Sequence, residues 1–215
     1  MKALNLYQLI KAYTSDVEEQ NICKLQNCKK CSSTQRTLLI DFDAVKEKKF
    51  SGHRKQNFIT STDGVKNSPN KENVFYFIES KSIKNVITNP RTNILSDETT
   101  IQRQSVKFLN KIDKKLPDSM QICCDIVNDP ALFSTELQPA LVFVSDIDTK
   151  QKPLDSLSMN LKKLSAPKIY YEIIFNQNIK TGLNVIKQNR KVNVYYTYCN
   201  NFDNELSSDF QNSLI

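Results

Sequence analysis

Residues 57–81, with the sequence NFITSTDGVKNSPNKENVFYFIESK, decide the expected fold, because they read as two strands joined by a polar loop. The first strand covers Phe58 to Thr62 and runs into Asp63-Gly64. The loop is rich in Asn, Ser, Pro and Lys, which are residues of turns. The second strand, Val74 to Ile78, is aromatic and β-branched without interruption, as expected for a strand that is buried on both faces. It ends in Glu79-Ser80-Lys81.

Three ionisable side chains are expected to gather at the end of these strands. Residues i and i+2 of a strand share a face, so Glu79 and Lys81 project to the same side, which Asp63 can also reach. Two carboxylates and an ammonium are costly to bury without partners at the edge of a hydrophobic sheet. Two carboxylates can hold Mg²⁺ while a phosphate and water molecules complete its octahedral shell. The pattern therefore predicts a metal site, with Lys81 placed to position or deprotonate an attacking water molecule, or to stabilise developing charge.

The combination of Asp63 with Glu79-Ser80-Lys81 after an apolar strand resembles the PD-(D/E)xK nuclease superfamily. The turn Ser61-Thr62-Asp63-Gly64 is similar to the PDG turn of its phage-exonuclease-like branch, with Thr62 where proline is usual. The resemblance covers about the first half of the chain. It implies a metal-dependent nuclease that hydrolyses phosphodiester bonds of DNA or RNA. Its catalytic residues would be Asp63, Glu79 and Lys81, and Asp63 and Glu79 would bind Mg²⁺ or Mn²⁺.

The same resemblance adds two candidates on helices. Glu18 would be a further, helix-borne metal ligand, although a carboxylate in a first helical turn is also favoured by the helix dipole alone. Gln104 lies on the helix that follows the Glu-x-Lys strand, from which some members of the superfamily contribute a Gln or Lys to the site. A simple solvated helix face is the preferred interpretation of Gln104.

The remaining elements predict an α/β fold, because strands and helices alternate along the chain. An apolar stripe from Leu4 to Tyr13 indicates a first helix, and Thr14 or Ser15 with Glu18 fits a capping box that starts a second. Further strands are expected at 37–45, 121–127, 140–144, 168–175 and 192–198, and further helices at 96–116 (ending before Pro117), 154–164 and 179–188. We expect a single restriction-endonuclease-like domain over residues 1–200. It would begin with a helix and three antiparallel strands, continue as a mixed sheet with flanking helices, and leave a polar, fraying tail at 201–215.

The charge of the chain favours a polyanionic partner. It has 30 Lys and Arg against 23 Asp and Glu, for a net charge of +7. A basic hairpin tip is expected at 46–55, where Phe50 could stack on a base and the candidate nucleic-acid-binding residues are Lys48, Lys49, His53, Arg54 and Lys55. A non-catalytic nucleic-acid-binding or assembly protein with a nuclease-like fold would fit the same charge. Only 3 glycines are present and no phosphate-binding GxxxxGK or GxGxxG loop, which disfavours a nucleotide-binding fold of those types.

The chain is expected to be intracellular, cytoplasmic or nuclear, and not secreted or bound to a membrane. No run approaches the ~18–20 apolar residues of a membrane span, and the N-terminus lacks the cleavage site of a signal peptide. In a reducing compartment the cysteines would not form a disulfide framework. Cys23, Cys28 and Cys31 could hold zinc, with a fourth ligand from His53, Cys123, Cys124 or Cys199. Free thiols beside lysines are the alternative.

A third hypothesis starts from Asp41 and Asp43, which follow the apolar run Leu38-Leu39-Ile40. This pattern resembles the first motif of haloacid-dehalogenase-like phosphatases, which implies Asp41 as nucleophile, Asp43 as acid/base and Mg²⁺ as cofactor. Asp146 and Asp148 would stand in for the late acidic motif, although the sequence Ser145-Asp146-Ile147-Asp148 departs from its usual form. The hairpin expected after Asp43 also leaves little room for the helix that a parallel sheet requires.

Overall fold

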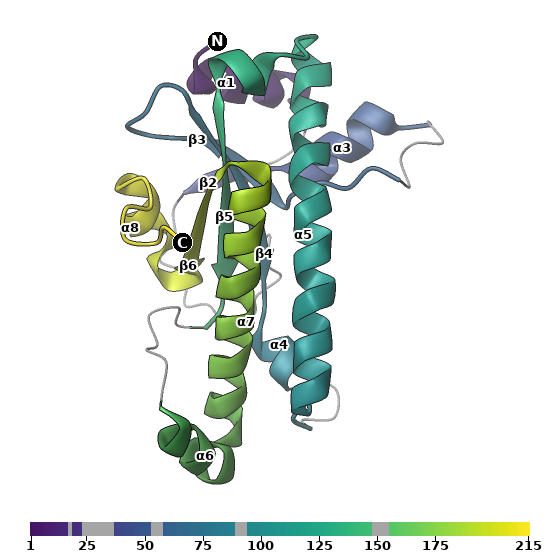
Figure 1. The fold of residues 1–215 in the computed structure, drawn as a ribbon. Helices are drawn as coiled ribbons and strands as arrows, with labels where there is room; N and C mark the ends of the chain where they lie inside the picture. The colour runs from purple at the N-terminus through teal and green to yellow at the C-terminus, as the bar shows by residue number, and fades with distance from the viewer. Residues whose placement is uncertain (17–18, 23–36, 53–57, 89–93, 148–154) are drawn as a thin grey trace.

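The computed structural model describes residues 1–16, 19–22, 37–52, 58–88, 94–147 and 155–215. They form one six-stranded mixed sheet with helices on both faces, in which the strands follow one another in chain order from β1 to β6 (Figure 1). The first four strands pair antiparallel, and β5 and β6 continue parallel to β4. The bounds of the strands are β1 Glu19–Asn21, β2 Leu38–Asp41, β3 Gly64–Asn67, β4 Val74–Lys81, β5 Gln138–Ser145 and β6 Asn193–Tyr198. This confirms the predicted α/β class with an antiparallel start.

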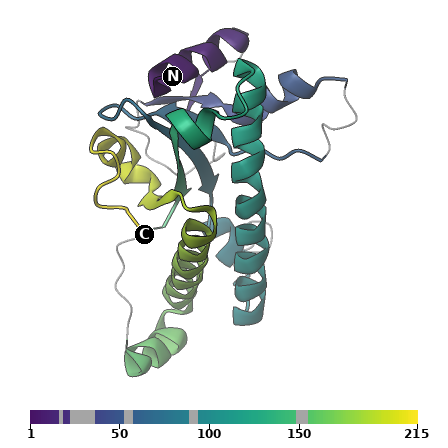
Figure 2. The same cartoon turned by 45° about the horizontal axis from the view of Figure 1, so that its top comes forward.

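Two hydrophobic layers hold the sheet, one on each face. Alternate residues of β4 divide between them, with Phe75 and Phe77 in the first layer and Tyr76 and Ile78 in the second. Helices α1, α3, α5 and α7 contribute to the first layer, whereas α8 packs in the second, on the opposite side of the sheet (Figure 2). The bounds of the helices are α1 Ala3–Tyr13, α3 Phe42–Phe50, α4 Lys84–Ile87, α5 Glu98–Val127, α6 Ser156–Ser165, α7 Pro167–Arg190 and α8 Phe202–Ser207. Because β4 is buried from Val74 to Ser80, the prediction of a strand covered on both faces is correct.

Helix α5 is longer than predicted, because it continues through Pro117 instead of ending before it. The strand expected at 121–127 is therefore wrong. Proline lacks the N–H that would bond to the carbonyl four residues earlier, which here belongs to Asp113. Arg190 of α7 compensates by donating from Nη2 to this carbonyl oxygen at 3.2 Å. The apolar side of the helix also continues past the proline, from Leu116 before it to Ile122 and Cys123 after it.

The region before β3 also differs from the prediction. The strand expected at 37–45 ends at Asp41, whose carboxylate accepts a hydrogen bond from the Ala44 amide at 3.1 Å and so starts α3 instead of a hairpin. Residues 58–62 are not a strand. Their amides bond to α5, from Thr60 to Asp118 at 2.9 Å and from Thr62 to the Ser119 hydroxyl at 2.8 Å. Asp63 consequently lies just before β3 instead of at the end of a strand.

Three more expectations are wrong. Residues 168–175 form the start of α7, because their buried residues continue at helical spacing into Ile179 and Leu183. Where a second helix was expected from Thr14 or Ser15, residues 14–16 form a turn, and β1 begins at Glu19. The tail at 201–215 does not fray, because Phe202 and Phe210 are completely buried in the second layer. Helix α1 and the strands predicted at 140–144 and 192–198 are confirmed, as is a helix at α6.

Candidate active site

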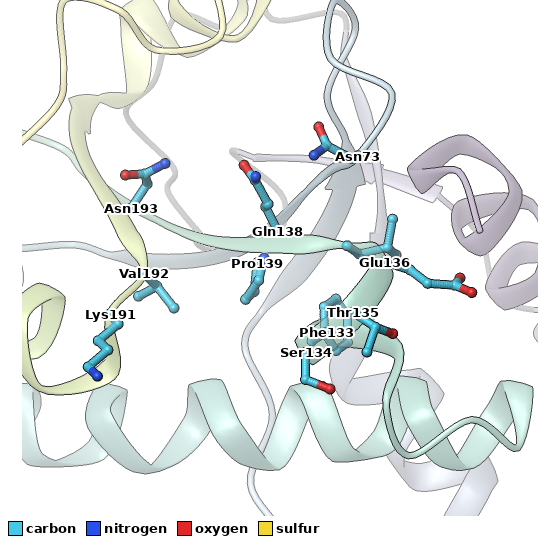
Figure 3. A pocket seen from close by; sticks show the side chains of 11 residues that line it. Asn73, Phe133, Ser134, Thr135, Glu136, Gln138, Pro139, Lys191, Val192 and Asn193 are labelled. Atoms are coloured by element: carbon cyan, nitrogen blue, oxygen red, sulfur yellow. The ribbon is translucent and has the colours of Figure 1, made fainter.

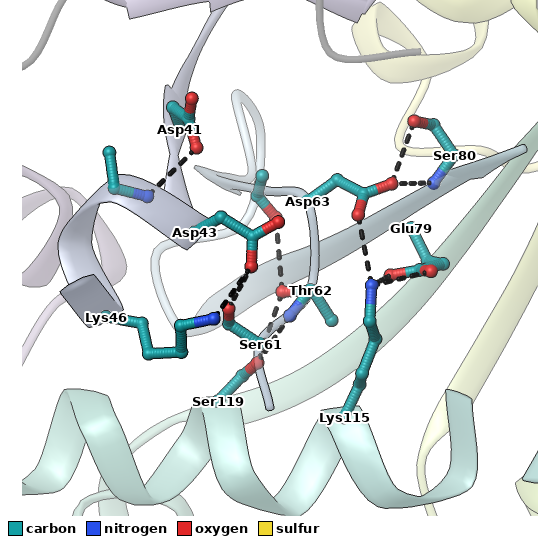
Figure 4. Close-up of polar contacts among 12 residues, drawn as sticks. Asp41, Asp43, Lys46, Ser61, Thr62, Asp63, Glu79, Ser80, Lys115 and Ser119 are labelled. Atoms are coloured by element: carbon teal, nitrogen blue, oxygen red, sulfur yellow. Dashed lines mark hydrogen bonds and ion pairs between the residues drawn. The ribbon is translucent and has the colours of Figure 1, made fainter. Parts of the chain in front are cut away.

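Asp63 and Glu79 converge on a single cation, the ammonium group of Lys115 on α5 (Figure 4). Lys115 Nζ lies 2.8 Å from both carboxylate oxygens of Glu79 and 3.1 Å from Oδ1 of Asp63. The prediction that these two carboxylates lie close together is correct, but it gave no role to Lys115. A signal for it was present, since Arg103, Lys107, Lys111 and Lys115 recur at every fourth residue of one helix.

Sheet geometry positions both carboxylates. Glu79 shares a face of β4 with Phe77, and this face is covered by α5. Asp63 is fixed from the other side, because its Oδ2 accepts hydrogen bonds from the amide and the hydroxyl of Ser80, at 2.8 and 2.9 Å. Its Oδ1 is thereby directed toward the ammonium group of Lys115.

The cluster carries an excess of negative charge in a mostly buried position. The exposed side-chain fraction is 5% for Glu79, 18% for Asp63 and 19% for Lys115. Burial, followed by repulsion from Asp63, raises the pKa of Glu79 to about 8, against the attraction of Lys115. Burial opposes the charge of Lys115, yet the two carboxylates raise the pKa of its ammonium above the ordinary value. Two carboxylates with one ammonium leave one negative charge, which a proton or a further cation can neutralise.

Lys81, the third residue of the predicted site, lies near the cluster but outside its hydrogen bonds. Its ammonium group is placed over the ring of Phe108 on α5, 5.5 Å from the ring centre. Phe108 precedes Lys115 by two helical turns on the side of α5 that faces β4. Lys81 is therefore an exposed cation that contacts α5 about two helical turns before Lys115. Gln104 lies one turn before Phe108, and its side chain forms no hydrogen bond with the described residues.

Asp41 and Asp43 do not form the arrangement that a phosphatase would need. Strand β2 pairs antiparallel with both of its neighbours, so Asp41 is not at the end of a central parallel strand. Asp43 accepts a hydrogen bond from Ser61 and lies 3.5 Å from Lys46 (Figure 4). Asp146 instead stabilises the start of α4. Its carboxylate accepts hydrogen bonds from the Ser82 hydroxyl at 2.6 Å, the Ile83 amide at 2.7 Å and the Lys84 amide at 3.2 Å. Asp148 lies outside the described residues.

The described basic residues of the predicted hairpin tip lie on α3 and interact within the protein. Lys48 pairs with Asp16, and Lys49 donates to the carbonyl oxygen of Asp125 at 3.2 Å. Phe50 is buried, so it is not available to stack on a base. His53, Arg54 and Lys55 lie outside the described residues.

The other metal candidates find no support among the described residues. Glu18, Cys23, Cys28 and Cys31 lie outside them, and Cys123, Cys124 and Cys199 are buried in the protein. Within the described ranges, no group of three or more His, Cys, Asp or Glu side chains is placed to hold a metal ion. Any metal at the Glu79 cluster would therefore have two described carboxylate ligands and take its remaining ligands from water or substrate.

An open cavity of about 430 Å³ lies away from this cluster, at the amino ends of the parallel strands (Figure 3). Its lining is mostly polar and includes Asn73, Gln138, Asn193 and Lys191. Glu136, also in the lining, pairs with the N-terminal ammonium group. The cavity contains none of the site residues that the sequence predicted.

Comparisons with known proteins give no family for this chain: no family model, curated protein or solved structure matches it. Among the described residues, no helix has the length and apolar character to cross a membrane.

The ionisation of Glu79 should make stability depend on pH. A glutamate in an unfolded chain titrates near pH ~4.3, whereas Glu79 in the folded protein titrates with a pKa of about 8. Between these values the folded state binds more protons, so the free energy of unfolding falls as the pH rises through the window. The contribution of Glu79 is fully present only below about pH 4.

Thermal unfolding from pH ~5 to ~9, a range that spans most of this window, checks the expectation. The melting temperature of the wild type should fall relative to that of Glu79→Gln as the pH rises, because glutamine does not ionise. Glu72→Gln, at an exposed position, should follow the wild type. Parallel curves for the wild type and Glu79→Gln would contradict the raised pKa.

Proposed function

We propose that this protein is a metal-dependent nuclease that hydrolyses phosphodiester bonds of DNA or RNA inside the cell. The observation that carries the proposal is that Asp63 and Glu79 direct three carboxylate oxygens at one cation, at 2.8–3.1 Å. The resemblance to PD-(D/E)xK nucleases predicted that these two carboxylates would meet.

The residues present fit a divalent metal ion. The ammonium group of Lys115 already stands as a cation between Asp63 and Glu79, and carboxylate oxygens are the ligands that Mg²⁺ and Mn²⁺ prefer. Asp63 and Glu79 would hold the ion, with water and substrate oxygens completing its shell. When bound, the ion supplies Lewis-acid stabilisation of the phosphoryl oxygens and lowers the pKa of a water molecule.

The protein's own groups perform the remaining tasks. Ser80 holds Asp63 in place through two hydrogen bonds, which fixes one side of the site. Lys81 is an exposed ammonium on the face of β4 that also carries Glu79, where it can bind a phosphate oxygen or orient water. Without metal, the ammonium group of Lys115 pairs with both carboxylates. With metal bound between the carboxylates, this ammonium group can turn to the negatively charged substrate.

A second candidate, a non-catalytic nucleic-acid-binding or assembly protein, is favoured by one observation. Lys115 bonds to both carboxylates at distances of a complete ion pair, as it would in a degenerate site whose metal has been replaced permanently. The two candidates differ in whether a divalent ion competes with this ammonium group.

A cleavage assay distinguishes the candidates. Purified protein is incubated with single-stranded DNA, double-stranded DNA and RNA, in Mg²⁺, Mn²⁺, Ca²⁺ or EDTA. A nuclease should cleave at least one substrate in Mg²⁺ or Mn²⁺ and none in EDTA, whereas Ca²⁺, with its looser coordination, should bind without supporting turnover. Absence of cleavage on every substrate would reject the nuclease proposal in favour of the binding or assembly protein.

A further inference from the structure

Helix α5 carries a row of four basic residues that ends in the candidate active site. Arg103, Lys107, Lys111 and Lys115 are each four residues apart, so they are neighbours along the helix surface. With a rise of ~1.5 Å per residue, each step advances ~6 Å and the row spans ~18 Å. The first three residues are exposed, and the fourth bonds to Asp63 and Glu79.

The row winds around α5, so that its first members face solvent and its last member faces the site. Four residues exceed one helical turn by ~40°, so each member is rotated in the same direction relative to the previous one. This rotation ends at Lys115, whose ammonium group meets the carboxylates at the sheet. Lys81 joins from β4 beside the row, with its ammonium group over Phe108 of the same helix. A single continuous helix therefore carries both the exposed cations and the ammonium group that contacts the buried carboxylates.

These cations are poorly compensated by the protein. Lys107 and Lys111 form no ion pair with a carboxylate of the described residues. Arg103 attracts the carboxylate of Asp97, at the start of α5, without forming a direct ion pair with it. By contrast, Arg190 and Lys163, on the neighbouring helices, are paired with Asp113 and Glu98. Like charges four residues apart destabilise a helix, so the row has no structural advantage of its own.

We infer that Arg103, Lys107 and Lys111, together with Lys81, bind the phosphodiester backbone of a nucleic acid and guide it to Asp63 and Glu79. The inference rests on the proposed nuclease function for its end point, but the binding surface can be tested without catalysis. Phosphates of one strand of B-form DNA advance ~3.4 Å along the helix axis, but they lie farther apart through space because the strand winds around that axis. The ~6 Å steps of the row are therefore comparable with the spacing of neighbouring phosphates.

The test compares two triple variants with the same decrease in positive charge. One is Arg103→Gln/Lys107→Gln/Lys111→Gln, and the other is Lys2→Gln/Lys71→Gln/Lys191→Gln, at exposed positions toward the amino ends of the parallel strands, away from the site. Fluorescence anisotropy in EDTA measures affinity for single-stranded DNA, double-stranded DNA and RNA between about 50 and 200 mM salt. For the row variant, the slope of log affinity against log salt should become shallower by about 2 to 3, since each phosphate that the protein neutralises contributes ~0.7–0.9 to the slope. The control should keep the wild-type slope.

Equal effects of the two triple variants, or an unchanged slope in the row variant, would overturn the inference, as would a wild type that binds none of the three nucleic acids. If the row variant fails to fold by circular dichroism, Lys107→Glu against Lys71→Glu makes the same comparison with one residue each. A wild type that binds through the row but never cleaves would reject the nuclease proposal and leave the binding surface standing. If cleavage occurs, the row variant should raise KM more than it lowers kcat.

Discussion

Glu79→Gln should reduce cleavage by about 10³-fold or more while leaving nucleic-acid affinity similar or higher. A metal ion contributes several kcal/mol to transition-state stabilisation, and each ~1.4 kcal/mol is a factor of ten in rate. Glutamine keeps the shape of the side chain but removes a charged ligand that lies 2.8 Å from the present cation. Affinity should not fall, because glutamine carries no negative charge that could repel the phosphates. Asp63→Asn should behave in the same way.

Single-turnover cleavage and binding in EDTA measure the two effects separately. Glu72→Gln provides a matched control, because it removes the same charge at an exposed position on the loop before β4. Lys81→Ala should also lose activity, but with Mn²⁺ still bound, which electron paramagnetic resonance can detect. Cleavage that survives both Glu79→Gln and Lys81→Ala would remove the nuclease assignment from this site.

Burial on both faces made the centre of the sheet predictable. Strands β4 and β5 contain uninterrupted apolar runs, Val74–Ile78 and Ala140–Val144, which only a fully covered strand accommodates well in a chain of this polarity. The two-residue period of a strand also predicted the side of β4 on which Glu79 projects. One of the two carboxylates of the site could therefore be placed from the sequence. Asp63 was correctly included, although its position comes from a turn before β3 and not from a strand.

The elements that were mispredicted depend on interactions between distant residues. The start of α7, with Tyr170, Tyr171 and Ile173, has the composition of a strand, but packing at helical spacing against the sheet decides its structure. At Pro117 of α5, the carbonyl oxygen that proline leaves without its helical partner accepts a hydrogen bond from Arg190, which is 73 residues away from the proline. No local pattern shows such a partner.

Lys115 could not be assigned for a related reason. An ammonium group on an amphipathic helix normally points to solvent, and only the tertiary position of α5 places this one against β4. The four-residue basic spacing identifies the row to which it belongs. It does not show which member turns inward, because that depends on how the helix is rotated on the sheet.

Lys115→Met should destabilise the protein by up to about 3–5 kcal/mol in EDTA, and most strongly above about pH 8, where Glu79 is ionised and two carboxylates face each other without their cation. Methionine preserves most of the side-chain volume, so the destabilisation would come from charge and not from a cavity. Chemical denaturation measures the change in the free energy of unfolding. Lys111→Met, one turn earlier at an exposed position, should change it by less than about 0.5 kcal/mol.

Two further measurements on Lys115→Met then separate a metal site from a permanent ion pair. If Asp63 and Glu79 are metal ligands, Mn²⁺ or Mg²⁺ should restore most of the stability, because a divalent ion replaces the missing ammonium group, and the gain should rise with ion concentration. The double variant Glu79→Gln/Lys115→Met should be more stable than Lys115→Met in EDTA, since the neutral amide needs no cation, and it should no longer respond to metal. A Lys115→Met protein that divalent ions do not stabilise would instead identify the cluster as a fixed ion pair, and it would favour the binding or assembly protein over the nuclease.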